Sequence, residues 1–318
     1  MISPPLVTII IPTYNRATKV FEAIESAINQ TYSNKQIVVV DDGSIDESKK
    51  VIANYPEVEY FYKENGGQSS ARNYGLKHAK GTLIASLDSD DIWQPDFLSR
   101  CVAKIEEGNF DFVFANWEQD VKIGTSWDFL ANDPFLKPYL VKEQNSWVEL
   151  NPQELRDLYL KSCPSPSSSV LIRRSSILSG WDQAINIGDD WFMYLELILS
   201  KKSSAAFTMD KLWRKRIDEI NIYDGRKWSE VLELLYIADL KATIAKFRPL
   251  LSESELNLLQ RRYMEALVEL SKHNLVREYK IPLSIKLLLR SFAVNLPFTL
   301  KTMLKVYIMA FERKMKWR

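Results

Sequence analysis

Three carboxylates stand within four residues, directly after an apolar segment. The apolar run 82–87 is followed by Asp88, Ser89, Asp90 and Asp91. Carboxylates this close repel one another, and a hard divalent cation or a cationic ligand commonly neutralises such a cluster. Ligands that are all oxygen favour Mg²⁺ or Mn²⁺ over zinc. An acidic turn without a metal is the alternative, but the position at the end of an apolar strand favours a divalent-metal site.

A second acidic pair, Asp41 and Asp42, follows the apolar run 36–40 and precedes Gly43. A carboxylate here could accept a hydrogen bond from an N–H on the edge of a base, and Gly43 permits close backbone approach. Tyr14, in the loop after the first apolar run, could stack on a flat base. Taken alone, however, the acidic pair is better explained as a turn followed by a helix cap.

The elements that must position these residues alternate through the first hundred positions. Apolar runs predict strands at 6–11, 36–40, 58–62 and 82–87, with further strands at 110–115 and 170–173. Helical patterns occupy 20–28 and 69–80. Strands that alternate with helices predict an α/β fold with a mostly parallel central sheet flanked by helices. In such sheets, ligands bind at the carboxyl ends of the strands, where the acidic clusters stand.

The pattern becomes helical from about residue 228 to the end. Ser252 and Glu255 have the spacing of a capping box, and Pro282 and Pro297 divide the remainder. We therefore expect an α/β domain over 1–224 and a helical C-terminal region over 225–318. Within the α/β domain, we expect a nucleotide-binding half over 1–115 and a second half over 116–224.

Five segments, in order and nearly continuous over residues 6–100, resemble family 2 glycosyltransferases. They are Val7–Asn15, Gln30–Tyr32, Val38–Asp46, Asn65–Gly75 and Leu87–Asp96. The resemblance implies a GT-A fold and transfer of a sugar, with inversion, from a nucleotide diphosphate donor, with UDP as the favoured nucleotide. The Gln-x-x-Arg-Trp signature of processive synthases is absent from the sequence, which favours transfer of a single sugar.

The resemblance also assigns candidate site residues. Asp42 would contact the base, Arg72 would approach the donor, and Asp88 and Asp90 would hold Mn²⁺ or Mg²⁺, with Asp88 nearer the ribose. The other residues of the implied nucleotide-sugar pocket are Pro12, Thr13, Tyr14, Asn15 and Ser89.

The implied general base is Asp190, within the segment 180–191. Asp189 replaces the more usual Glu of the family, which leaves its role open. Both acidic residues could instead cap a helix beginning at Trp191. The acceptor half would be 116–224, and the acceptor would be a glycan or a lipid-linked sugar. A catalytically silent module that binds a nucleotide-sugar or a glycan is the alternative function.

The charges of the chain are balanced but unevenly placed. Lys and Arg number 42 against 41 Asp and Glu, which argues against a dedicated nucleic-acid binder. Residues 281–318 nevertheless carry eight basic residues and one acidic residue, so the rest of the chain is acidic. This basic, amphipathic end predicts either peripheral contact with an anionic membrane or packing on the catalytic domain or on a partner chain in a homo-oligomer.

Two cysteines and no visible targeting segment favour a cytoplasmic location. If the basic end binds a membrane, the location would be the inner face of the cytoplasmic membrane.

Overall fold

The computed structural model describes residues 4–122, 125–216 and 226–315, with the backbone alone at 120–122, 125–127 and 308–315. The chain forms two compact units. The first unit comprises Met1–Gln183 and Asp189–Ile217, and the second comprises Ala184–Gly188 and Asp218–Arg318. The domain boundary expected after residue 224 lies outside the described residues.

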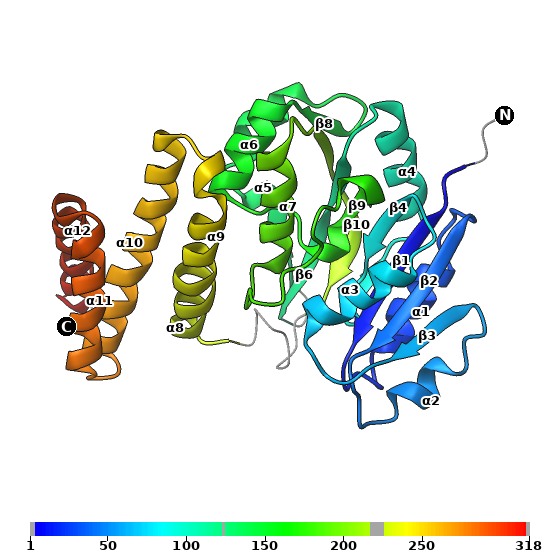
Figure 1. Cartoon of the computed structure of the whole chain (residues 1–318), viewed down its shortest axis with the longest axis horizontal. Helices are drawn as coiled ribbons and strands as arrows, with labels where there is room; N and C mark the ends of the chain where they lie inside the picture. Colours follow the sequence, from blue (N-terminus) through cyan, green and yellow to red (C-terminus); the bar gives the residue numbers. More distant parts are fainter. Residues whose placement is uncertain (1–3, 123–124, 217–225, 316–318) are drawn as a thin grey trace. The chain divides into compact units, whose positions relative to one another are not determined.

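One sheet organises the first unit, in the order β3-β2-β1-β4-β9-β6-β10-β5, with β7 paired to β6 and β8 to β10 (Figure 1). Neighbouring strands are parallel from β3 to β4 and between β6 and β10, and the remaining pairs are antiparallel. The strands are β1 Val7–Thr13, β2 Lys35–Asp41, β3 Val58–Tyr62, β4 Leu83–Ser86, β5 Asp91–Trp93, β6 Phe112–Lys122, β7 Thr125–Asp128, β8 Trp147–Leu150, β9 Val170–Arg173 and β10 Ala205–Lys215. Strand β6 crosses the expected division at residue 115, so both expected halves share this sheet.

Helices flank the sheet, and α3 packs closely on it. A Cβ atom at Gly75 would lie 2.5 Å from Cγ2 of Ile10 in β1, so only glycine allows this approach. The close packing fixes the distance of α3 from the sheet, and therefore also the position of Arg72, one turn earlier in the helix. The helices and helical turns of the first unit are α1 Val20–Ile28, α2 Ser48–Ile52, α3 Gln68–His78, α4 Phe97–Glu107, α5 Phe129–Asn132, η1 Lys137–Lys142, α6 Pro152–Lys161, η2 Ser167–Ser169, η3 Arg174–Ser176 and α7 Asp189–Ser200.

The described part of the second unit is helical after its short segment Ala184–Gly188. The capping box predicted at Ser252 and Glu255 is present at the start of α10, with both reciprocal hydrogen bonds formed. Among the described residues, no helix combines the length and the apolar character needed to cross a membrane. The elements are α8 Trp228–Val231, the π-helical stretch η4 Leu232–Asp239, α9 Leu240–Phe247, η5 Arg248–Leu250, α10 Glu253–Val276, α11 Ile281–Val294 and α12 Leu296–Met315.

Candidate active site

The loops that follow β1 and β2 meet at one edge of the sheet. The two strands are parallel and pair Thr13 with Asp41, so their carboxyl ends lie side by side. The backbone N–H of Asp42 donates to the carbonyl of Thr13 at 2.8 Å. Asn15 has a φ of 51°, a left-handed conformation that asparagine tolerates, and its N–H donates to Oγ of Ser44 at 2.8 Å. The two loops therefore form one wall.

The residues expected to line the nucleotide pocket lie on this wall. Pro12 and Thr13 are buried, and Oγ1 of Thr13 is buried without a hydrogen-bond partner. A buried hydroxyl without a partner is unfavourable, and a bound ligand could satisfy it. The ring of Tyr14 is half exposed and so is accessible for stacking. A free polar atom beside an accessible ring fits a pocket for a nucleotide.

Asp42 already has several internal partners. Its buried carboxylate accepts hydrogen bonds from Nζ of Lys63 at 2.5 Å and from the N–H groups of Gly66 and Gly67 at 3.0 and 2.7 Å. It thereby anchors the loop that leads into α3. A contact between Asp42 and a base would be added to this structural role, and it stays a prediction.

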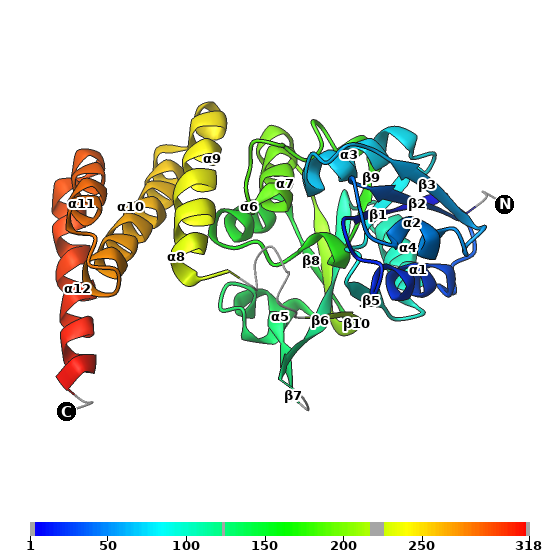
Figure 2. The same cartoon turned by 90° about the horizontal axis from the view of Figure 1, so that it is seen from below.

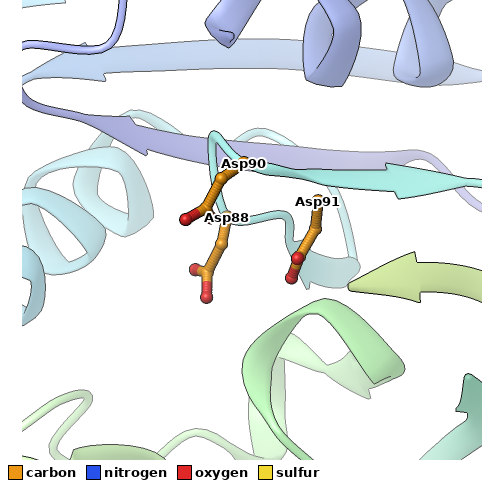
Figure 3. A group of neighbouring side chains, drawn as sticks. All are labelled: Asp88, Asp90 and Asp91. Atoms are coloured by element: carbon orange, nitrogen blue, oxygen red, sulfur yellow. The ribbon is translucent and has the colours of Figure 1, made fainter. Parts of the chain in front are cut away.

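The acidic cluster after β4 has the composition of a divalent-metal site. The carboxylates of Asp88, Asp90 and Asp91 each place an oxygen within 4.8 Å of the others and point to the same side of the loop (Figure 3). Oδ1 of Asp91 is buried without a hydrogen-bond partner. Burial and the neighbouring carboxylates raise the pKa of Asp90 and of Asp91. An all-oxygen donor set with an unpartnered buried oxygen fits Mn²⁺ or Mg²⁺. Ser89, within the cluster, is buried.

The side chain of Arg16 places a positive charge beside the acidic cluster. Nη2 of Arg16 lies 3.3 Å from Oδ2 of Asp90, which links the loop of the acidic cluster to the loop after β1. The sequence analysis did not single out Arg16. Only the position of Arg16, directly after the Pro-Thr-Tyr-Asn segment, could have indicated that it belongs to the site.

Arg72 lies in the middle of three carboxylates. Its Nη2 is 2.7 Å from Oδ1 of Asp88, and its Nη1 is 2.9 Å from Oδ2 of Asp189 and 3.8 Å from Oδ1 of Asp190. The side chain is 2% exposed. Arg72 therefore joins the acidic cluster to the start of α7. Its expected approach to the donor stays a prediction.

The single guanidinium of Arg72 cannot neutralise three carboxylates, and one of them, Asp189, has a raised pKa. Burial raises the pKa of Asp189 to about 7, the positive charge of Arg72 opposes the shift, and the negative charge of Asp190 adds to it. The pKa of Arg72 is raised by its three acidic neighbours despite its burial. Asp189, whose role the sequence left open, is thus a structural partner of Arg72.

Asp190 is held by three donors. Its Oδ1 accepts hydrogen bonds from Oγ of Ser167 at 2.5 Å and from Nε1 of Trp181 at 2.8 Å, and its Oδ2 accepts the N–H of Ser167 at 3.0 Å. Among the described residues, no other group donates a hydrogen bond to Oδ2, so a lone pair is available there. Asp189 and Asp190 are the first two residues of α7, where negative charge is favourable. Helix capping and a catalytic role are therefore compatible.

Two adjacent serines in the turn η2 connect Asp190 to the acidic cluster. Ser167 holds Asp190, whereas Oγ of Ser168 donates to Oδ2 of Asp91 at 2.6 Å and accepts the N–H of Asp88 at 3.0 Å. The sequence analysis gave neither serine a role. The polar run 162–169 was the only signal, and it does not say where the turn lies.

Comparison with known proteins supports the identity that this geometry suggests. The profile of the family described as "Glycosyl transferase family 2" matches residues 8–175, more than half of the chain. The chain belongs to glycosyltransferase family 2. Membership of this family favours sugar transfer over the alternative of a silent binding module.

This family 2 glycosyltransferase has relatives among known sequences and structures. An uncharacterized glycosyltransferase of Rickettsia typhi is 31% identical over 68% of the chain and 65% of the relative. The chain thus spans just under two thirds of that relative, and smaller shares of the next similar ones.

Two solved glycosyltransferases confirm the fold. Staphylococcus aureus TarS 1–349, solved with UDP-GlcNAc, superposes with a TM-score of 0.61 at 17% identity, over 96% of this chain and 92% of TarS 1–349. The mannosyltransferase PcManGT of Pyrobaculum calidifontis, solved with GDP-Man and Mn²⁺, gives a TM-score of 0.55 at 18% identity, over 99% and 84% of the two chains. The GT-A fold with C-terminal helices is thereby confirmed.

Proposed function

We propose that this glycosyltransferase moves one sugar, with inversion, from a UDP-linked donor to a glycan or lipid-linked acceptor, with Asp190 as the general base. The proposal rests on one observation: the guanidinium of Arg72 contacts both the acidic cluster and Asp190. A donor held at the cluster would therefore have its reacting carbon within the reach of a base. The UDP-GlcNAc complex of TarS supports a nucleotide-sugar donor for this fold.

Asp88 and Asp90 would hold the divalent ion, Mn²⁺ or Mg²⁺. When bound, such an ion supplies positive charge to the diphosphate that leaves the sugar. The Mn²⁺ in the PcManGT complex supports this assignment for the fold. Pro12, Thr13, Tyr14, Asn15, Asp42 and Ser89 would complete the donor pocket.

The residues of this chain would remove the proton of the acceptor hydroxyl and orient the carboxylate that receives it. The acceptor hydroxyl oxygen would form a bond to the anomeric carbon as the bond from that carbon to the diphosphate oxygen breaks. The hydroxyl proton would pass to Oδ2 of Asp190, where a lone pair is available. Ser167 and Trp181 would keep the carboxylate aimed, because their hydrogen bonds use its other acceptor positions.

A panel of nucleotide-sugars tests the proposal, with donor binding followed by calorimetry and turnover by release of the nucleoside diphosphate. Water or added sugars serve as acceptors, with Mn²⁺, Mg²⁺ or EDTA present. Asp190→Asn should retain donor binding and lower turnover by about 10²- to 10⁴-fold, the usual contribution of a general base. Asp90→Asn should abolish the effect of the metal on donor affinity.

Asp157→Asn is the matched control, because this carboxylate lies on α6 and its recorded partner is the side chain of Gln153. It should behave as the wild type. Unchanged turnover of Asp190→Asn would refute the base assignment. A donor affinity that is the same with and without EDTA, and the same in Asp90→Asn as in the wild type, would refute the metal assignment.

A further inference from the structure

Helices α11 and α12 bury small polar side chains and expose large apolar ones. Ser284, Ser291, Thr299 and Thr302 are all buried. Six large apolar residues are each more than half exposed: Ile281, Ile285, Leu289, Leu296, Leu300 and Leu304. A helix on a water-soluble protein normally turns its apolar stripe inward and its polar side outward. The usual arrangement is therefore largely inverted in these two helices.

Hydroxyl groups mediate the inward packing. Oγ of Ser271 in α10 lies 2.8 Å from Oγ of Ser284, and Oγ of Ser291 lies 2.8 Å from Oγ1 of Thr299. Both views of the chain show α11 and α12 side by side next to α10 (Figures 1 and 2). Small hydroxyl residues at helix contacts, with apolar residues outside, are typical of helices whose outer surface meets lipid.

The exposed apolar residues form two rows bordered by positive charge. Ile281, Ile285 and Leu289 are four residues apart on α11, and Leu296, Leu300 and Leu304 have the same spacing on α12. Lys286, Lys301 and Lys305 each follow a member of a row, and all three are exposed. The sequence contains no acidic residue between Glu278 and Glu312.

We propose that these two rows and their three lysines form a surface that binds anionic phospholipid. The apolar rows would enter the boundary between headgroups and acyl chains, and the lysines would meet the lipid phosphates. Charge argues against a second copy of the chain as the occupant, since each copy would bring a basic surface to another basic surface. The proposal does not rest on the sugar-transfer chemistry.

Flotation of the full chain with vesicles tests this surface. One set of vesicles contains phosphatidylcholine alone, and the other also contains phosphatidylglycerol. The charge variant is Lys286→Gln/Lys301→Gln/Lys305→Gln, and the apolar variant is Ile285→Ser/Leu289→Ser/Leu300→Ser. The matched control replaces three exposed lysines of the first unit: Lys49→Gln/Lys77→Gln/Lys161→Gln. All substituted side chains are exposed, so each variant should fold, and circular dichroism checks this.

The wild type and the control should float with the anionic vesicles and not with phosphatidylcholine alone, and salt should weaken the binding. A lysine near an anionic surface strengthens binding by about fivefold, so the charge variant should bind about a hundredfold more weakly. The apolar variant should also lose flotation.

Absence of wild-type flotation with anionic vesicles would overturn the proposal, and so would flotation that survives in both variants. A dimer in light scattering that the apolar variant converts to a monomer, without any lipid binding, would instead assign the surface to a second copy.

Discussion

Replacing Arg72 with methionine would leave three carboxylates around the same point without their shared cation. The contacts from Arg72 to Asp88 and Asp189 are 2.7 and 2.9 Å long, and the Arg72 and Asp189 side chains are each 2% exposed. Removing one partner of a buried ion pair costs about 3–5 kcal/mol, because the other charge stays buried without compensation. Since the free energy of unfolding of a domain is about 5–15 kcal/mol, the loss should be large.

Urea unfolding followed by tryptophan fluorescence, with EDTA present, measures this loss. Arg72→Met should lower the free energy of unfolding by about 3–5 kcal/mol. Asp189→Asn in the same chain should restore part of it, because one of the uncompensated charges is then absent. Arg100→Met is the control: its ion pair with Asp210 is partly exposed, and such pairs contribute about 0–1 kcal/mol.

The pH dependence provides the refutation. The charge of Arg72 lowers the pKa of Asp189, which is about 7 in the wild type, so this pKa should be higher in Arg72→Met and the deficit should shrink as the pH falls toward about 7 from above. A deficit below about 1 kcal/mol at neutral pH, or one that does not grow between about pH 7 and about pH 9, would show that Arg72 does not hold these carboxylates together.

Three further predictions concern the same region. Ser167→Ala should lower kcat about tenfold or more without changing the donor KM, whereas Ser169→Ala in the same turn should not; equal effects would exclude a specific role for Ser167. The raised pKa of Asp189 means that wild-type stability falls as the pH rises from about 4 to about 7, and Asp189→Asn should remove that slope in urea unfolding. Asp239 accepts the N–H groups of Ile187 and Gly188 at 2.8 and 3.0 Å, so Asp239→Ala should cost about 1–3 kcal/mol in thermal unfolding.

The first half of the candidate site could be predicted because local patterns determine it. Strands β1, β2 and β4 are short apolar runs in a parallel arrangement, and parallel strands bring their carboxyl ends to one edge. The loops after them therefore had to converge, whatever the details of the side chains. The strands predicted at 58–62 and 170–173 were correct to the residue.

The second half could not be read in the same way, because its contacts are distant in sequence. Ser168 meets Asp91 across 77 positions, and Arg72 meets Asp189 across 117. The antiparallel strand β9 brings η2 beside the acidic cluster, and no local pattern in the sequence indicates which strands β9 pairs with. Strand β10 was missed because its pairing with β6 contains two register shifts, which interrupt the simple alternation of apolar and polar residues.

The arrangement of charge predicts that a bound diphosphate would need a divalent ion at this site. Asp88 and Asp189 share the cation of Arg72, and Asp90 has Arg16 at 3.3 Å, but Asp91 is buried with one oxygen unpartnered. A diphosphate brought to this edge would add negative charge to a region whose carboxylates already resist ionisation. Buried like charges are costly unless a cation separates them. Donor and metal should therefore bind cooperatively, each raising the affinity for the other by the same factor.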